Sequence, residues 1–414
     1  MKYDTLVLGA GMVGVSAALH LQQRGRSVAL VDRRGAAEET SHGNGGIIQR
    51  EGVVPYGFPR DIGKLFDYAL NRLPEAHLHW SALPAIAPWL VRYFLASSPD
   101  RLARSAQAMR PLVERCVVEH EALMAEAGAA GMIRNTGYLR VFRSARRFDE
   151  QAAVEERHRN LYGVNSASRS AAEIKQLEPH LTAELAGGYH YLDPVSVADP
   201  SALGKAYAEL FRRRGGHFLT ADARTLEPSA EGWQVRTVDG PVAARDVVVA
   251  LGPWAAEILR PLGFTPPLGW KRGYHMHFGA RGNATLARPV IDVENGYLLM
   301  QAATGIRLTT GAEFARRDAP PTPVQLSKVE PLARELFPLA DRLDPKPWLG
   351  TRPCLPDMVP MIGAIPGRKG LWADFGHHHL GFTLGPVSGR LIAEMVTGEP
   401  THTDPWPYRA DRFS

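Results

Sequence analysis

The sequence predicts an α/β protein with two domains, one built on a parallel Rossmann-like sheet and the other on an antiparallel sheet. Residues 3–32 read as a strand, a glycine-rich turn, a helix and a second strand, which together make a βαβ unit. Residues 246–250 form another buried apolar run, and residues 263–345 alternate short strands with turns. A chain of 414 residues with 45% hydrophobic content can fill the cores of two such domains.

The N-terminal unit begins with an apolar strand at 5–8 that ends in a glycine-rich turn. Gly9, Gly11 and Gly14 follow the G-x-G-x-x-G spacing, which is a fingerprint of dinucleotide binding when it joins a strand to a helix. The first glycine permits the tight turn, the second lets the backbone approach a pyrophosphate, and the third lets the helix pack closely on the strand. A glycine-rich turn alone would indicate only a turn, but this order of elements predicts a dinucleotide site.

The helix and the second strand of this unit supply further cofactor candidates. The free N–H groups at the start of the helix, at Met12 and Val13, are expected to bind phosphate oxygens. The second strand, 28–31, ends at Asp32, where a carboxylate accepts hydrogen bonds from an adenosine ribose, and Arg33 follows. Because this carboxylate disfavours a phosphate on the ribose, the predicted ligand is FAD or NAD and not NADP.

Two other glycine-containing segments are candidates for the same site. The loop at 41–46 follows the ribose-binding acid, and its glycines would let the backbone approach a ligand, although an ordinary surface turn has a similar composition. The strand at 246–250 leads through a glycine to a new helix and would be adjacent to the dinucleotide if it lies beside the first strand. The cofactor candidates in these segments are Ser41, Asn44, Gly45, Gly46, Ala250, Gly252 and Trp254.

The composition limits the classes of partner. The 48 Lys and Arg residues exceed the 43 Asp and Glu residues, for a net charge of +5. This charge suits an anionic cofactor, an acidic substrate or an anionic membrane surface, and it is too small and diffuse to indicate nucleic acid. The two cysteines, Cys116 and Cys354, suit a reducing cytoplasm and show no metal-ligand spacing. The histidines at 377–379 predict no metal site either, because adjacent side chains in an extended chain point to opposite faces.

No run of 18 apolar residues offers a transmembrane helix. The N-terminus enters the first strand at once, so a cleaved signal peptide is not expected, and the expected location is the cytoplasm. Residues 86–95 fit either a peripheral contact with the inner face of the cytoplasmic membrane or a helix packed into the protein. Packing is the commoner fate of such a segment and is the one we favour.

Two C-terminal segments carry the most specific pattern. Residues 350–363 read GTRPCLPDMVPMIG, and residues 375–386 read FGHHHLGFTLGP. With the N-terminal unit, the loop at 40–46 and VVVALGPWA at 247–255, they resemble the D-amino acid oxidase superfamily of flavoproteins, most closely its D-amino acid dehydrogenase branch. The resemblance runs nearly end to end. It implies an FAD-binding domain formed by residues 1–53, 188–262 and 346–414, and a substrate-binding domain formed by residues 54–187 and 263–345.

The resemblance also implies roles for individual residues. Arg352 would bind the substrate carboxylate, and a guanidinium does present paired donors that match this group. Tyr297 matches a tyrosine that also bonds the carboxylate in several relatives, although a tyrosine in a strand is as often a core residue. Tyr274, His275 and His277 would line the side-chain pocket or pack in the core.

The last segment would lie beside the flavin. His377 matches the family histidine there, whereas His378 stands where relatives usually have glycine, which leaves the path of the backbone open. Cys354 is not spaced as in the sarcosine oxidases with covalent flavin, so we expect noncovalent FAD. The N–H groups of a helix start would stabilise negative charge on reduced flavin, and they belong to Gly381, Phe382 and Thr383.

The reaction implied by the resemblance is FAD-dependent oxidation of the Cα–N bond of a small D-amino or imino acid by hydride transfer. D-proline and hydroxy-D-proline are candidate substrates, the product is an imine or a 2-oxo acid, and a quinone or another carrier is the expected electron acceptor. Oxidation of sarcosine, glycine or a 2-hydroxy acid on the same scaffold stays open. A non-enzymatic flavin-binding protein is disfavoured, because such a protein needs no clamp like Arg352.

Overall fold

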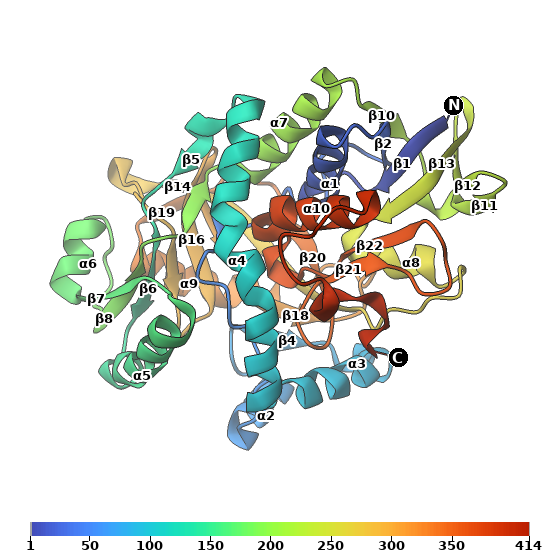
Figure 1. Ribbon diagram of the computed structural model, residues 1–414. Coiled ribbons are helices and arrows are strands. Elements are labelled where there is room, and N and C mark those ends of the chain that lie inside the picture. Colours follow the sequence, from blue (N-terminus) through green and yellow to red (C-terminus); the bar gives the residue numbers. More distant parts are fainter. Residues whose placement is uncertain (1, 414) are drawn as a thin grey trace.

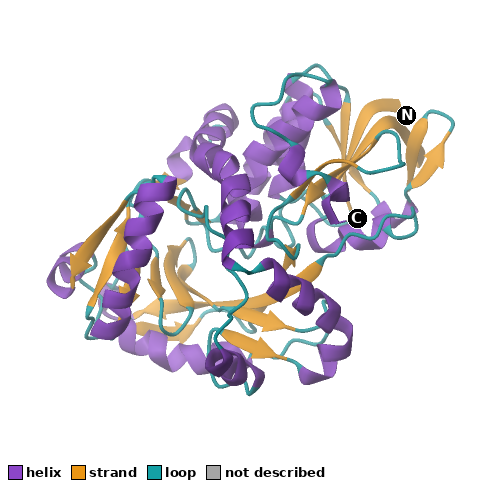
Figure 2. Ribbon diagram, turned by 60° about the horizontal axis from the view of Figure 1, so that its bottom comes forward, coloured by secondary structure: helices purple, strands orange, loops and turns teal. Residues whose placement is uncertain are grey.

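The computed structural model describes residues 2–413, which form two large sheets and one small sheet with helices around them. Figure 2 shows the strands of the two large sheets as separate groups, with the N-terminus in one of them. The small sheet joins β3 (Ile47–Ile48), β9 (Val195–Val197) and β5 (Ile133–Arg134). This arrangement is the predicted α/β fold with a Rossmann-like sheet and a second sheet.

The first sheet is the Rossmann-like one. Its strand order is β10-β2-β1-β13-β12-β11, and β22 pairs with β13 and with β21. The strands β10, β2, β1, β13 and β22 are parallel, so their carboxyl ends meet at one edge. Because β13 lies directly beside β1, the strand predicted at 246–250 is adjacent to the glycine-rich turn. The strands are β1 (Lys2–Leu8), β2 (Val28–Asp32), β10 (His217–Thr220), β11 (Glu227–Ser229), β12 (Gly232–Thr237), β13 (Gly240–Val249), β21 (Met361–Ala364) and β22 (Leu371–Phe375).

Helices cover both faces of the first sheet. On one face α1 (Met12–Gln23) packs against α10 (Gly381–Thr397) and α7 (Pro200–Arg213), and the long helix α4 (Pro99–Ala127) crosses α10 (Figure 1). Their apolar sides form one core, in which Cys116 is fully buried. The short helix α8 (Ala255–Leu259) packs on the other face.

The second sheet is mainly antiparallel, as predicted. Its order is β4-β18-β14-β17-β16-β15-β6-β8-β7, and β14 also pairs with β19 and β20. Two pairs, β15 with β6 and β18 with β4, are parallel. The strands are β4 (Ala76–Leu78), β6 (Tyr138–Phe142), β7 (Ser166–Ser170), β8 (Gly187–Tyr191), β14 (Gly269–Ala280), β15 (Val290–Asp292), β16 (Tyr297–Ala302), β17 (Gly305–Thr309), β18 (Ala312–Phe314), β19 (Leu339–Arg342) and β20 (Trp348–Cys354).

The expected domain boundaries do not follow the sheets. β8 and β20 belong to the second sheet, although residues 188–262 and 346–414 were assigned to the FAD-binding domain. The helix α4 packs on α7 and α10 of the first domain, although it falls within 54–187. The chain therefore crosses between the two sheets at points that local sequence did not reveal.

Other elements differ from the prediction in detail. The helix α9 (Val324–Leu336) lies in the region 263–345, where only strands and turns were predicted, and residues Ala223–Thr225 form a short 3-10 helix. The segment at 86–95 belongs to α3 (Leu83–Ala96), which buries Trp89 and Tyr93 but leaves Val91 and Leu95 exposed. The remaining helices are α2 (Ile62–Ala69), α5 (Ala145–Tyr162) and α6 (Ala171–Leu177).

Within residues 2–413, no helix combines the length and the apolar character that crossing a bilayer requires.

Candidate active site

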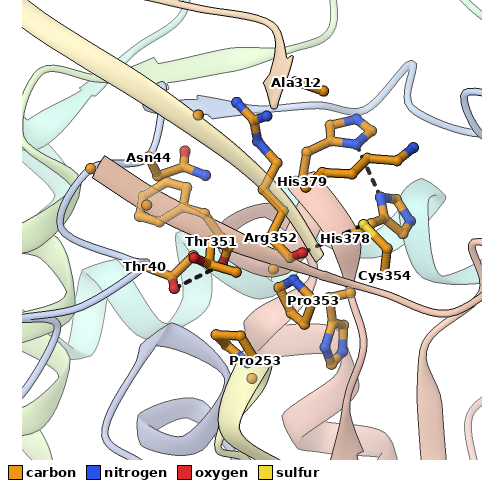
Figure 3. A pocket seen from close by; sticks show the side chains of 18 of the residues that line it. Thr40, Asn44, Pro253, Ala312, Thr351, Arg352, Pro353, Cys354, His378 and His379 are labelled. Atoms are coloured by element: carbon orange, nitrogen blue, oxygen red, sulfur yellow. Dashed lines mark hydrogen bonds between the residues drawn. The ribbon is translucent and has the colours of Figure 1, made fainter. Parts of the chain in front are cut away.

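A cavity of about 880 Å³ lies between the two large sheets. One part of its wall is the carboxyl edge of the first sheet, at Gly9, Asp32 and Ala250, and another part is the second sheet at Arg352. Ligand cavities usually measure about 300–1,000 Å³, so this space suits a large ligand. Figure 3 shows a close view of the cavity, with Arg352 and His379 among the side chains that line it.

The glycine-rich turn brings the start of α1 to the cavity. A Cβ on Gly14 would lie 1.8 Å from the carbonyl oxygen of Gly9, and a Cβ on Gly9 would lie 2.6 Å from that of Ala250. Gly9 also has a φ of +101°, which favours glycine. Gly11 has no side chain to cap α1, and apart from the N–H of Met12, which donates to Ser41, the first N–H groups and the dipole of this helix are available to an anionic ligand.

Asp32 connects the end of β2 to this turn. Its Oδ2 accepts a hydrogen bond from the N–H of Ala10 at 2.9 Å, and its Oδ1 accepts one from the N–H of Arg34 at 2.8 Å. The guanidinium of Arg33 lies 5.1 Å from the ring centroid of Trp254, and both residues line the same cavity. The carboxylate therefore stands at the strand end where dinucleotide folds bind the adenosine ribose.

The loop at 40–46 connects the two parts of the cavity wall. Ser41 Oγ accepts a hydrogen bond from the N–H of Met12 at 3.0 Å. Thr40 Oγ1 donates to the carbonyl oxygen of Thr351 on β20 at 3.1 Å, as Figure 3 shows. The side chain of Asn44 accepts a bond of 2.8 Å from the N–H two residues further on, which fixes the turn. The loop is thus anchored to the first sheet at one end and to the second sheet at the other.

The start of α10 is attached to the same region. Thr383 Oγ1 accepts a hydrogen bond from the N–H of Gln49 at 3.2 Å and donates to the carbonyl oxygen of Ile47 at 3.3 Å. The carbonyl oxygen of Phe382 is bonded to Nε2 of His120 at 2.8 Å. These bonds hold the first turn of α10 against the segment that follows the glycine-rich loop.

Most of the predicted cofactor residues line the cavity. Gly14, Gly46 and Thr383 do not, because they pack behind its wall against other parts of the backbone. Those that line it are Gly9, Gly11, Met12, Val13, Asp32, Arg33, Ser41, Asn44, Gly45, Ala250, Gly252, Trp254, Gly381 and Phe382.

These residues fit a dinucleotide. The uncapped start of α1 supplies donors for a pyrophosphate, and Asp32 supplies acceptors for a ribose at the same edge of the sheet. The cavity then continues past the loop at 43–45 and the start of α10 to the second sheet. FAD, with its ring system beyond the pyrophosphate, suits this continuous space.

Arg352 lies on β20 and reaches into the cavity at the second sheet (Figure 3). Its Nη1 donates to the carbonyl oxygen of Gly311 at 2.8 Å, and its Nη2 donates to that of Thr310 at 3.3 Å. A Cβ on Gly273 of the neighbouring strand β14 would lie 2.7 Å from Nη2, so the glycine makes room for the guanidinium. Burial lowers the pKa of Arg352, but a guanidinium stays protonated in proteins. Three of its five N–H donors are left for a ligand.

His377 forms a buried pair with Asp374, at the end of β22. Its Nε2 lies 3.4 Å from Oδ1 of Asp374, and neither atom has a hydrogen-bond partner within the described residues. Burial lowers the pKa of His377 to about 3, so its imidazole is neutral near pH 7, and burial raises the pKa of Asp374 well above its ordinary value. Sequence reasoning missed Asp374, and an acid at the end of an apolar run was the one signal that could have found it.

His378 and His379 complete this side of the cavity. His378 has a φ of +44°, the left-handed region that glycine favours, so the backbone follows here the path that a glycine would adopt more easily. The Nδ1 atoms of the two rings lie 3.0 Å apart, so one donates and the other accepts. Burial lowers the pKa of both, that of His379 to about 3, and the two imidazoles are therefore neutral.

Tyr297 does not direct its hydroxyl toward Arg352. The hydroxyl accepts from Nη2 of Arg143 at 3.3 Å and donates to the carbonyl oxygen of Leu332 on α9 at 3.1 Å. The next residue, Leu298, faces the loop instead, since its Cδ2 would lie 2.9 Å from a Cβ on Gly45. Tyr297 lines the cavity, but these contacts turn its hydroxyl toward α9, so its binding of the substrate carboxylate stays a prediction that they do not support.

The residues proposed for a side-chain pocket are engaged in packing. The hydroxyl of Tyr274 donates to Oε2 of Glu313 at 2.9 Å. His275 stacks on Trp348 with ring centroids 4.8 Å apart, and Nδ1 of His277 lies 2.8 Å from Oδ2 of Asp344. Of the two readings that the sequence left open for these residues, the contacts favour core packing.

Sequence reasoning also missed Lys271 and Tyr93. Lys271 lies on β14 directly opposite Arg352 on β20, and its Nζ donates to the hydroxyl of Tyr93 at 2.7 Å. Both residues line the cavity. No local pattern could indicate this pair, because Lys271 and Tyr93 are 178 positions apart in the chain.

The sequence and the structure are similar to those of known flavoproteins. The family model DAO, FAD dependent oxidoreductase, matches residues 4–395. A D-amino acid dehydrogenase from Paramagnetospirillum magneticum is 31% identical over 99% of this chain and 98% of that protein, and a D-amino-acid oxidase from Bradyrhizobium diazoefficiens is 29% identical over 98% of both. The solved structure of glycine oxidase from Geobacillus kaustophilus has a TM-score of 0.75 at 20% identity, over 99% of both chains. The chain therefore belongs to the DAO family of FAD-dependent oxidoreductases.

Proposed function

We propose that this protein oxidises the Cα–N bond of a D-amino or imino acid by hydride transfer to FAD. The observation that carries the proposal is Arg352, a half-buried cation with free donors in the same cavity as the glycine-rich turn. A carboxylate is the group that a guanidinium binds best in this geometry. The relatives that are 31% and 29% identical are named as a D-amino acid dehydrogenase and a D-amino-acid oxidase, which supports the D-configuration.

In this proposal the protein acts by positioning the substrate. Arg352 binds the carboxylate in two bonds and thereby fixes the direction of the Cα hydrogen. When bound, FAD supplies the ring that accepts the hydride and its two electrons. Burial lowers the pKa of His379 to about 3, so this imidazole is too weak a base to take a proton from an ammonium, and the substrate reacts in its neutral amine form. The buried surroundings exclude water, which strengthens the charge-assisted bonds of Arg352.

The product would be an imine, which water converts to a 2-oxo acid, or a cyclic imine when the substrate is D-proline or hydroxy-D-proline. For the electrons, we propose a quinone or another carrier as the acceptor, in line with the dehydrogenase among the relatives. Exposed Val91 and Leu95 on α3 would support a peripheral contact with a membrane that holds such a quinone.

The test is anaerobic mixing of the yellow holoenzyme with single amino acids while the flavin absorbance is recorded. Bleaching by D-amino or D-imino acids, and none by their L-isomers, is the expected result. Bleaching by sarcosine, glycine or a 2-hydroxy acid alone would replace the proposed substrate class with one of these. Absence of bleaching with every compound would contradict the proposal that the protein is an amino acid oxidoreductase.

A further inference from the structure

Two cations, the buried Lys271 and the half-buried Arg352, stand opposite each other on one face of the cavity. In the antiparallel pair of β14 and β20, Lys271 is the direct partner of Arg352. Directly opposed residues of such a pair project from the same face with their Cβ atoms about 4.5–5.5 Å apart. Like charges in this position destabilise a sheet, so the pair requires an explanation.

No protein carboxylate neutralises either cation. Within residues 2–413 neither Lys271 nor Arg352 takes part in an ion pair at 4.0 Å or less, although the structure contains many such pairs. Lys271 is buried, with only 9% of its surface exposed, and Arg352 is half-buried. An isolated buried charge is costly, and the usual remedy in a folded protein is a paired anion.

The partners of Lys271 are uncharged. Its Nζ donates to the hydroxyl of Tyr93 and lies 4.1 Å from the centroid of that ring. The hydroxyl in turn donates to the carbonyl oxygen of Tyr56, so Tyr93 remains a neutral phenol. Burial raises the pKa of Tyr93 and of the neighbouring Cys354, which keeps both protonated. An ammonium has three donors, and a single protein bond leaves two of them for a ligand.

The acidic residues that line the cavity are engaged elsewhere. Asp32 is bonded to the glycine-rich turn, and Oε1 of Glu75 accepts a bond of 3.1 Å from the hydroxyl of Tyr68 and lies 3.8 Å from Nζ of Lys64. Asp374 faces His377, with its Oδ1 3.4 Å from Nε2 of that ring, and burial raises the pKa of its carboxyl well above the ordinary value. The other acids of the wall, which lie at the rim of the first sheet, are Glu38, Glu39, Asp222 and Glu257.

The two cations point to different places. The guanidinium of Arg352 lies over Gly273 and bonds to the carbonyl of Gly311, whereas Lys271 reaches toward α3 at Tyr93. Gly273 is two residues beyond Lys271 on β14, which corresponds to about 6.6 Å along a strand. The charges therefore form two separate anion positions in one cavity. Burial lowers the pKa of Lys271 to about 8, so at pH 7 the ammonium is still mainly charged.

We propose that Lys271 binds a second carboxylate of the substrate while Arg352 binds the first, so that the preferred substrates are dicarboxylic amino or imino acids. This inference rests on the proposed function and adds a substrate class to it. The second carboxylate would come either from a side chain, as in D-glutamate and D-aspartate, or from a group on nitrogen, as in iminodiacetate. The neutral analogues of these compounds would leave the ammonium of Lys271 unpaired in a buried site.

The experiment compares matched substrates on the holoenzyme. The pairs are D-glutamate with D-glutamine, D-aspartate with D-asparagine, and iminodiacetate with sarcosine, and kcat/KM is measured by anaerobic flavin reduction. A charge-assisted bond supports a preference of about 10- to 100-fold for the charged member, expressed mainly in KM. The pair with the larger preference shows whether the second carboxylate belongs to a side chain or to nitrogen.

Variants assign the preference to Lys271. Lys271→Met, which keeps the length of the side chain, should abolish the preference and leave the neutral substrates within a few-fold of wild type. Lys271→Arg should keep part of the preference. Lys2→Met, which removes an exposed lysine paired with Glu231 on the first sheet, is the matched control and should change nothing.

A binding measurement separates this inference from the proposed function. Glutarate should perturb the flavin spectrum with a Kd about 10- to 100-fold lower than butyrate, and Lys271→Met should equalise the two. If no amino acid reduces the flavin, the proposed function fails while glutarate binding still decides the role of Lys271. The inference is overturned if neutral substrates are preferred, or if Lys271→Met weakens charged and neutral substrates equally, which would assign Lys271 to the shared carboxylate.

Discussion

Replacing Arg352 tests the carboxylate site directly. In Arg352→Lys the positive charge remains, but the paired geometry of the guanidinium is lost. In Arg352→Met both the charge and the donors are lost, while the side chain keeps a similar length. Because Nη1 and Nη2 each already bond to a backbone carbonyl, at 2.8 and 3.3 Å, the guanidinium is fixed before a ligand arrives. A substrate therefore benefits from a preformed pair of donors.

The number of hydrogen bonds that Arg352 can offer to a carboxylate sets the size of the expected loss in kcat/KM. A hydrogen bond to a charged group contributes about 1.5–3 kcal/mol, so loss of one of two such bonds in Arg352→Lys should lower kcat/KM about 10- to 100-fold. Loss of both in Arg352→Met should lower it about 100- to 10,000-fold. The methionine variant should also be less stable, because the carbonyls of Thr310 and Gly311 lose their donor at a cost of about 1–3 kcal/mol.

The assay is stopped-flow reduction of the bound flavin under anaerobic conditions, with the FAD content and the melting temperature of each variant measured beside it. The reasoning predicts normal FAD content and a graded loss of reduction, with lysine less damaging than methionine. Equal kcat/KM in wild type and Arg352→Met would refute the assignment of the carboxylate to Arg352. A loss of FAD in both variants with unchanged reduction per flavin would assign the residue to cofactor binding.

Three further predictions follow from the geometry. Gly273→Ala places a Cβ 2.7 Å from Nη2 of Arg352, so the guanidinium must shift. We expect kcat/KM to fall about 10-fold with little change in melting temperature. An unchanged kcat/KM would show that the guanidinium adapts without loss. At His378, where φ is +44°, the Gly variant should be more stable in urea than the Ala variant by about 1 kcal/mol, since both lack the ring and only alanine is strained. Burial lowers the pKa of His120 to about 4, so the unfolded state binds more protons between pH 6.5 and 4. The contribution of His120 to stability is complete above pH 6.5 and should decline by about 1.4 kcal/mol per pH unit as the pH falls toward 4. Other buried histidines add declines of the same sign, so His120→Gln should reduce the slope in urea titrations by this one increment; an equally steep decline in the variant would contradict the assignment.

The parts of the site that are local in sequence could be predicted from it. Gly9, Gly11 and Asp32 lie within one βαβ unit, where turn geometry and helix direction follow from neighbouring residues. The departure at His378 was also visible in the sequence, and the structure explains it by a left-handed backbone. These features could be predicted without knowing how the rest of the chain folds.

The parts that depend on strand register could not be predicted. Tyr297 and Leu298 both stand in an apolar run, and only the tertiary packing decides which of them faces the loop and which faces α9. The opposition of Lys271 and Arg352 depends on pairing between strands about eighty residues apart, which hydrophobic patterns do not encode. The helix α9 was missed for another reason, since Pro323 and Pro331 interrupt its helical pattern.

The measurement that tests the central claim most directly is an anaerobic titration of the purified protein with pairs of D- and L-amino acids. The account predicts a yellow protein whose flavin absorbance is bleached by D-isomers and is unchanged by L-isomers, with D-glutamate or another dicarboxylate at the lowest concentration. A colourless protein that also fails to bind added FAD would contradict the assignment of the cavity. A yellow protein bleached only by L-isomers would contradict the proposed reaction.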